Sequence, residues 1–191
     1  MVVCFTGRRP KDLCGYNHHS YTNFTTNLAK WLYETYGDDT TFITGGAQGF
    51  DQIAFWAVDL IKTLYPNASG IKNIVYVPLR GQDHIWKQSG AFSRDEYSLM
   101  LNTADEVVYL HEATENKKEI VMLLQRRNEA MVDASNHVIA LYPDDGWRTA
   151  QHSGTANCMN YALRKNKTLM QIKYTIANNE LIMPNIVHTI V

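Results

Sequence analysis

Short apolar runs alternate with helical patterns along almost the whole chain, and this alternation constrains the fold more than any other feature. Six segments are predicted as strands: "MVVCFT", "TTFIT", "NIVYVP", "DEVVYL", "HVIALYP" and "TLMQIKY". Between them, apolar residues recur every three or four positions, as at Phe24, Leu28 and Leu32. This alternation is typical of a parallel sheet with helices on both faces. The sequence therefore predicts an α/β, Rossmann-like, three-layer fold with a mostly parallel sheet.

The length and the end of the alternating pattern predict the domain organisation. A chain of 191 residues suits one sizeable hydrophobic core and is short for two. The main domain is predicted to span residues 1–172, and residues 173–191 form a C-terminal extension. The tail from Thr175 to Val191 is apolar but has no helical period. We expect this tail to be an edge strand or hairpin, or a contact with another copy.

Composition narrows the functional classes. Hydrophobic residues make up 45% and charged residues 19%, and the net charge is −1, which argues against a general nucleic-acid binder. The N-terminus lacks a signal-peptide pattern, and no apolar run approaches the roughly 20 residues of a membrane span. Neither the three cysteines nor the seven histidines show metal-ligand or disulfide spacing. We expect a cytoplasmic protein with no membrane association, no metal site and no cofactor.

Four of the predicted strands are followed by unusual loops. These loops are "TGRRP" (6–10), "TGGAQGFD" (44–51), "PLRGQDHIW" (78–86) and "HSGTANCMNYA" (152–162). All four follow strands of one parallel sheet and so lie at the same edge. Ligands of such sheets bind at this edge, where the strand order reverses. The convergence is stronger evidence for a site than any one loop.

Two of these loops have the features of a phosphate site. Gly45 and Gly46 permit positive φ and close approach of a ligand to the backbone. The next helix offers unpaired N–H groups and the positive end of its dipole, which suit an anion. Residues 153–155, "SGT", open a later helix in the same way. Each motif alone could be only a capped helix start, but the nearby Arg8 and Arg9 favour a phosphate site.

Two charged residues have open roles. Asp51 at the start of a helix could favour the helix dipole or hold a ribose hydroxyl. Arg127 lies on a predicted helix, where an arginine is more often solvated surface. The candidate ligand-binding residues lie in the four loops or on this helix: Thr6, Gly7, Arg8, Arg9, Gly45, Gly46, Ala47, Gly49, Asp51, Gln82, Arg127, Ser153, Gly154 and Thr155.

These motifs resemble the SLOG superfamily, which joins the Smf/DprA proteins and the Lonely-guy phosphoribohydrolases. "TGGAQGFDQIAFWAV" resembles its glycine-rich helix start, and "QRRNEAMVDASNHVIALYPD" with "SGTANCMNYALRKNK" resembles its second half. "FTGRRP" and "PLRGQDHIW" look like a small bacterial and phage branch. The resemblance covers residues 1–172. It implies a Rossmann-like fold that binds a nucleotide and assembles into a homodimer or a larger homo-oligomer.

The resemblance to Lonely-guy enzymes breaks at four positions of their catalytic motif, and the last of them matters most for the chemistry. Those enzymes hydrolyse the N-glycosidic bond of nucleoside 5′-monophosphates. They use an arginine and the glutamate of a P-G-G-x-G-T-x-x-E motif. Arg127, Gly154 and Thr155 match, but the motif begins A-Q-H and Cys158 replaces the glutamate. Cleavage through an oxocarbenium-like state needs a carboxylate, which a neutral thiol does not replace. Glu129 or Asp51 could substitute, although no pattern places either of them. Arg127 is thus catalytic only if the protein is an enzyme.

The sequence therefore favours binding over hydrolysis. SLOG domains are similar to sensors in antiphage effectors that bind cyclic ADP-ribose-type signals. We expect the chain to bind an ADP-ribose-like nucleotide as a sensor or sponge without turnover. One alternative is a nucleoside 5′-monophosphate phosphoribohydrolase, and a second is a DNA-associated Smf/DprA-like protein, against which the near-neutral charge counts. Trp86 and Tyr109 could stack on a base or belong to the core.

Overall fold

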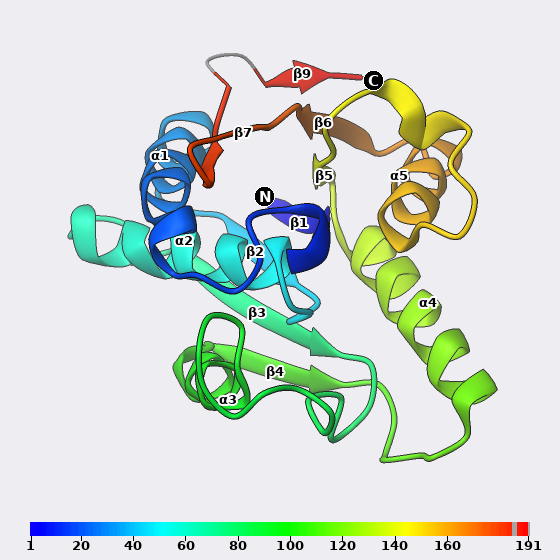
Figure 1. Ribbon diagram of the computed structural model, residues 1–191. Helices are drawn as coiled ribbons and strands as arrows, with labels where there is room; N and C mark the ends of the chain where they lie inside the picture. The colour runs from blue at the N-terminus through cyan, green and yellow to red at the C-terminus, as the bar shows by residue number, and fades with distance from the viewer. Residues whose placement is uncertain (185–186, 191) are drawn as a thin grey trace.

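The computed structural model describes residues 1–184 and 187–190. Within them, seven strands form one sheet in the order β4-β3-β2-β1-β5-β6-β9 (Figure 1). The strands are β1 (Val2–Gly7), β2 (Thr41–Thr44), β3 (Lys72–Val77), β4 (Glu106–Tyr109), β5 (His137–Leu141), β6 (Thr168–Ile172) and β9 (His188–Thr189). All neighbours pair in parallel except β9, which pairs antiparallel with β6. The predicted α/β fold with a mostly parallel sheet is confirmed.

Helices cover both faces of the sheet and complete the three layers (Figure 1). The helices on one face are α1 (His19–Tyr36), α2 (Phe50–Leu64) and α3 (Arg94–Thr103), and those on the other are α4 (Lys117–Ala134) and α5 (Gly154–Arg164). Two 3₁₀ turns, η1 (Pro10–Asp12) and η2 (Asp145–Arg148), lie in loops. Among the helices of the described residues, none has the length and apolar character that crossing a membrane requires.

The central strand shows why the strand sequences are continuously apolar. Val3 and Phe5 of β1 pack into the core on the side of α1 and α2, whereas Cys4 between them packs on the side of α4 and α5. All three side chains are fully buried. Strands covered on both faces need apolar residues at every position, rather than at alternate ones. Burial on both sides therefore fixes β1 in the middle of the molecule.

The strand order reverses at β1. From β1 the chain builds β2, β3 and β4 on one side, and it then returns to place β5 and β6 on the other. β1 and β5 pair in parallel up to Gly7 and Leu141. The connections leaving these two strands run in opposite directions, which opens a crevice at their carboxyl ends. The fold therefore puts its ligand-binding position next to Gly7.

The C-terminal tail contains a hairpin and an edge strand. β7 (Thr175–Ala177) and β8 (Glu180–Ile182) pair antiparallel, and Asn178 and Asn179 turn between them with φ of 51° and 60°. Leu181 is buried in the core beside α1. The expected tail extends to Val191, which lies with 185–186 outside the described residues. The domain boundary at residue 172 stays a prediction.

Candidate functional site

A pocket of about 540 Å³ opens at the carboxyl edge of the sheet, where the strand order reverses. We call it the β1–β5 pocket. Its walls come from the loop after β1, the loop after β2, α4, the end of β5 and the start of α5. The predicted residues that line it are Thr6, Gly7, Arg8, Arg9, Ala47, Asp51, Arg127, Ser153, Gly154 and Thr155. The structure thus gathers most of the predicted set in one place.

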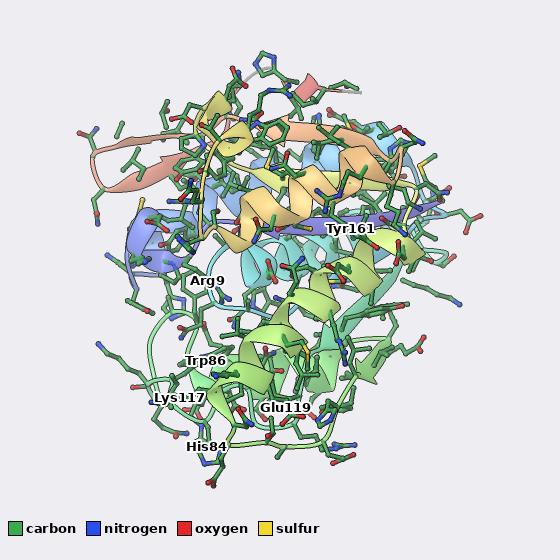
Figure 2. The ribbon with its side chains drawn as sticks, turned by 90° about the vertical axis from the view of Figure 1, so that its right-hand side faces the viewer. Arg9, His84, Trp86, Lys117, Glu119 and Tyr161 are labelled. Carbon is green, nitrogen blue, oxygen red and sulfur yellow. The ribbon has the colours of Figure 1, made fainter. Side chains whose placement is uncertain are left out.

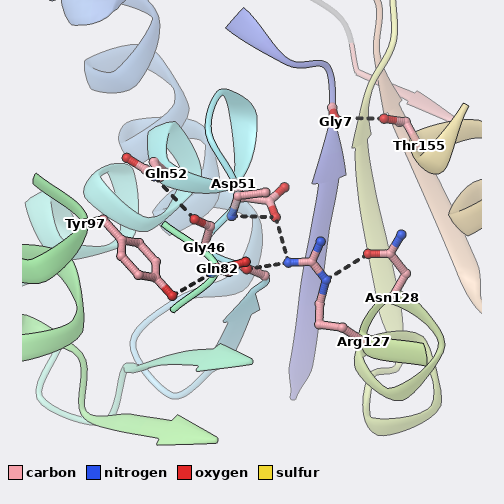
Figure 3. A network of polar contacts seen from close by, with 11 residues as sticks. Gly7, Gly46, Asp51, Gln52, Gln82, Tyr97, Arg127, Asn128 and Thr155 are labelled. Carbon is pink, nitrogen blue, oxygen red and sulfur yellow. Dashed lines mark hydrogen bonds and ion pairs between the residues drawn. The ribbon is translucent and has the colours of Figure 1, made fainter. Parts of the chain in front are cut away.

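Two of the residues that line the β1–β5 pocket form a buried ion pair (Figure 3). Arg127 comes from α4 and Asp51 from α2, on opposite faces of the sheet, and they are only 4% and 7% exposed. Arg127 Nη1 lies 3.5 Å from Asp51 Oδ2 and donates to the Gly45 carbonyl. Its Nε donates to Asn128 Oδ1 at 2.9 Å. A helix arginine that would ordinarily be solvated is therefore buried in the site.

The loop after β2 is held against this ion pair. The backbone N–H of Ala47 donates to Asp51 Oδ2 at 3.3 Å, and Gln52 Nε2 donates to the Gly46 carbonyl at 3.3 Å. Asp51 sits in the first turn of α2, where a carboxylate favours the helix dipole. This geometry gives Asp51 a structural role. Its carboxylate also lines the pocket, so contact with a ribose hydroxyl stays a prediction.

The glycines of "TGGAQG" make room for protein atoms. A Cβ on Gly45 would overlap the Arg127 guanidinium, and one on Gly49 would overlap the Arg8 carbonyl. Gly46 and Gly49 have φ of +64° and +97°, a region that favours glycine. These three glycines are not part of the pocket lining. They draw the loops together around the site, and their direct contact with a phosphate stays a prediction.

The start of α5 forms the opposite wall. Ser153 caps the helix, and its Oγ accepts from the Ala156 N–H at 3.2 Å. Thr155 Oγ1 donates to the Gly7 carbonyl at 2.7 Å and ties α5 to the end of β1 (Figure 3). Just before the cap, His152 has a positive φ of 60°. The first turn of a helix has N–H groups without intrahelical partners, and here that turn faces the pocket.

Basic side chains outnumber acidic ones in the pocket lining. The basic residues are Arg8, Arg9, Lys11 and Arg127, and the acidic ones are Asp12 and Asp51. Arg8 pairs with Asp12 at 3.2 Å, and its guanidinium lies 5.0 Å from the Tyr142 ring centroid. Its buried Nε has no hydrogen-bond partner among residues 1–184 and 187–190. A cationic crevice in a protein with a net charge of −1 attracts anions locally.

Cys158, at the position of the Lonely-guy glutamate, lies outside the pocket lining. Its side chain is 1% exposed in the core beneath α5, and burial raises the pKa of the thiol to about 12. Glu129 is also outside the lining, and its Oε1 accepts from Gln125 Nε2 at 2.9 Å. Of the two carboxylates that could replace the glutamate, only Asp51 lines the pocket.

Several lining residues were missing from the predicted set. They are Lys11, Asp12, Asn128, Tyr142, Ala150, Gln151 and His152. Tyr142 directly follows β5, and its place at a strand exit is a signal that could have found it. Gln82 lies elsewhere: it lines a second pocket and donates to the Tyr97 hydroxyl at 2.5 Å. Within residues 1–184 and 187–190, no cluster of side chains could hold a metal ion.

A parallel sheet that reverses at β1, with a cationic pocket at the reversal, defines a Rossmann-like protein with a ligand-type crevice. A family model described as "YspA SLOG family" (YpsA) matches residues 3–176. The chain belongs to this family, and the resemblance to the SLOG superfamily is confirmed.

Two further comparisons agree with this assignment. The chain is 40% identical over 128 residues to the "Uncharacterized SPbeta prophage-derived protein YoqJ" of Bacillus subtilis (strain 168), covering 63% of this chain and 68% of that protein. The fold is similar to DNA processing protein A (DprA) from Streptococcus pneumoniae, with a TM-score of 0.55 and 14% identity. That match covers 93% of this chain, which spans only 52% of the DprA chain. The similarity to YoqJ supports the phage-related branch.

Proposed function

We propose that the protein binds an ADP-ribose-like nucleotide in the β1–β5 pocket, a cyclic ADP-ribose-type signal included, as a sensor or sponge. The observation that carries the proposal is the start of α5 facing a cationic pocket at the strand-order reversal, with Asp51 in the first turn of α2 on the other side. Helix starts favour phosphate groups. A volume of about 540 Å³ is within the roughly 300–1,000 Å³ of small-molecule sites.

The charges of the pocket support a diphosphate ligand. Arg8 and Arg9 follow β1, and Arg8 Nε is a buried donor that finds no partner in the part of the chain that the structure describes. The first turn of α5 adds backbone N–H groups on the facing wall. Two donor sets on opposite walls suit two phosphates better than one. An arginine guanidinium also offers paired donors that match phosphate oxygens.

The surroundings of Cys158 and Asp51 support binding without turnover. Hydrolysis of a glycosidic bond needs a carboxylate that can stabilise charge or activate water. Cys158 supplies a buried thiol outside the pocket. Asp51 Oδ2 is already engaged by Arg127 and by the Ala47 N–H. An aspartate held in this way is poorly suited to act as a mobile base.

One observation favours the hydrolase alternative. Asp51 and Arg127 lie 3.5 Å apart and line the same pocket. A carboxylate beside an arginine is the minimum that the chemistry of the Lonely-guy enzymes requires. This alternative predicts release of a free base that depends on both residues, whereas a binder releases its ligand unchanged.

A single mixture distinguishes these functions. The protein is incubated with nucleoside monophosphates, ADP-ribose, cyclic ADP-ribose isomers and NAD, and the free compounds are chromatographed before and after heat denaturation. We expect one ligand to disappear and to return intact on heating. Base and sugar phosphate would instead indicate the hydrolase. If no compound changes, the nucleotide proposal is wrong, and a DNA gel-shift assay then tests the Smf/DprA-like alternative.

A matched pair of variants ties the result to the pocket. Arg8→Ala removes a pocket arginine, and Arg164→Ala removes an exposed arginine at the end of α5. We expect only Arg8→Ala to prevent depletion of the ligand. Equal loss in both variants, or in neither, would place binding outside the β1–β5 pocket.

Self-association belongs to the same proposal. Val121 and Met122 on the outer side of α4 are 67% and 44% exposed, which leaves apolar surface available to another copy. Light scattering after gel filtration measures the mass directly. A monomer at all concentrations would contradict this part of the proposal and leave ligand binding unaffected.

A further inference from the structure

A second pocket of about 600 Å³ adjoins the first, and Arg9 lines both. Its walls come from the loop after β3, the loop after β4 and the first half of α4. We call it the Trp86 pocket. Figure 2 shows Arg9, Trp86 and His84 following one another along this side of the molecule. The two pockets therefore meet at a single arginine.

The Trp86 pocket differs chemically from its neighbour. Its apolar lining includes Leu79, Ile85, Trp86, Ile120 and Leu124. Ile85 is 92% exposed, which leaves a large apolar side chain uncovered at the pocket. The β1–β5 pocket is instead lined mainly by charged and polar groups. Adjoining cationic and apolar pockets suit one ligand with a charged part and an apolar, planar part.

Packing against Tyr97 fixes the position of the Trp86 ring in the pocket wall. The Trp86 ring packs edge-on against Tyr97, with centroids 5.0 Å apart and planes at 71°. Tyr97 is 4% exposed, and its hydroxyl accepts from Gln82 Nε2 at 2.5 Å (Figure 3). Gln82 also lines the pocket, and its hydrogen bond to Tyr97 uses its Nε2 rather than its Oε1. An anchored ring with a nearby amide oxygen can stack on a base and accept from its edge.

We propose that the Trp86 pocket is the base subsite of the nucleotide site. The inference rests on the proposed function, because it places the phosphates of the same ligand in the β1–β5 pocket. The planar base stacks on Trp86, and Gln82 Oε1 accepts from an amino group on its edge. Arg9 lies at the junction, where its guanidinium can contact both the phosphates and the ring. Tyr109 lines neither pocket, and the Arg80 guanidinium lies 3.9 Å from the centroid of its ring.

The test follows the indole N–H signals of the four tryptophans in ¹⁵N-labelled protein. The spectrum of Trp86→Phe identifies the Trp86 signal by its absence. Adenosine, pyrophosphate and ADP-ribose are then titrated separately. We expect adenosine and ADP-ribose to shift the Trp86 signal strongly, and pyrophosphate to leave it in place while it shifts backbone signals of the β1–β5 pocket.

Affinities provide the second arm. Trp86→Ala should weaken ADP-ribose binding about tenfold or more, the size of a lost base–aromatic stack, and leave pyrophosphate binding unchanged. Trp86→Phe keeps a ring and should restore most of the affinity. Trp31→Ala on α1 is the matched control, because Trp31 lines neither pocket, and it should bind as the wild type does.

The outcomes separate the two proposals. If ADP-ribose binds without moving the Trp86 signal, or binds Trp86→Ala as tightly as the wild type, the base subsite is wrong and the nucleotide function stands. If adenosine moves the Trp86 signal but neither ADP-ribose nor pyrophosphate binds the β1–β5 pocket, the subsite stands and the proposed function fails. If none of the three compounds binds, both are wrong.

Discussion

Gly45 and Arg127 compete for the same space: a Cβ on Gly45 would overlap the Arg127 guanidinium, whose Nη1 donates to the Gly45 carbonyl. Gly45 follows β2, and Arg127 comes from α4, 82 positions further along the chain. The guanidinium then reaches Asp51 at the start of α2. Gly45 has the sequence context of a phosphate-binding loop, but its missing side chain leaves the space that the Arg127 guanidinium fills.

Gly45→Ala should destabilise the fold and weaken nucleotide binding together. The added methyl group displaces Arg127 and leaves Asp51 buried without its partner. We expect a loss of about 2 kcal/mol, typical of overpacking, and a melting temperature lower by roughly 4–8 °C for a domain of this size. Differential scanning calorimetry measures the melting temperature, and the ligand-depletion assay measures binding.

Two controls separate overlap from a general effect of alanine. A Cβ on Gly154 would come no closer than 3.9 Å to Asn128 Nδ2, so Gly154→Ala should change stability by less than about 0.5 kcal/mol. In an Arg127→Ala background the overlap is gone, and Gly45→Ala should then cost much less than in the wild type. Strictly additive losses in this double-mutant cycle would show that the two residues do not compete.

Asp51→Asn should reduce stability and tighten pyrophosphate binding. The change keeps the shape of the side chain but leaves the Arg127 charge, 3.5 Å away, buried without a counter-charge. Loss of one partner of a buried pair costs on the order of 3 kcal/mol. It also removes a negative charge from a pocket that receives anions. Urea unfolding and calorimetric titration measure the two effects. Weaker pyrophosphate binding would contradict this account.

The burial of Arg127 could not be predicted from the sequence. A helical pattern does not reveal that an arginine in α4 crosses the sheet edge to Asp51, because burial depends on how α4 and α2 are placed. The fold itself was predictable, since alternating strands and helices are local patterns that admit few topologies. The β1–β5 pocket followed from the rule that strand exits converge, which also brought Thr6 and Thr155 together.

The Trp86 pocket could not be predicted in the same way. Its walls are the loops after β3 and β4, and no rule of strand order fixes how two long loops fold. Gln82 was expected to bind the ligand together with residues of the other loops, but it lines the Trp86 pocket, and its Nε2 donates to Tyr97 on α3. The sequence indicated that the glycines after β2 allow a close approach to the backbone. It could not show that atoms of distant segments of the protein make that approach.

Cys158→Glu should restore the residue type of the Lonely-guy motif without restoring hydrolysis. The side chain at this position is 1% exposed and lies outside the pocket. A carboxylate buried there without a partner should cost more than about 3 kcal/mol. Chromatography should detect no base release from nucleoside monophosphates. Cys158→Ala is the control for loss of the thiol and should remain much more stable. Base release by a folded Cys158→Glu protein would show that this position reaches the ligand.

Acid should weaken the fold partly through His137. Burial lowers the pKa of His137 below its ordinary value of 6.5, and its Nδ1 lies 3.2 Å from the Tyr36 hydroxyl. Below about pH 6.5, the unfolded chain binds a proton at this residue more readily than the folded chain does. The free energy of unfolding therefore falls as the pH decreases through this range, and the contribution is fully present above it.

His137→Asn removes this titration and keeps a polar group near Tyr36, so the stability of the variant should depend less on pH. Urea unfolding between about pH 7.5 and about pH 5 measures the slope in the range where the histidine titrates. Parallel slopes for the wild type and His137→Asn would mean that other groups carry the acid sensitivity.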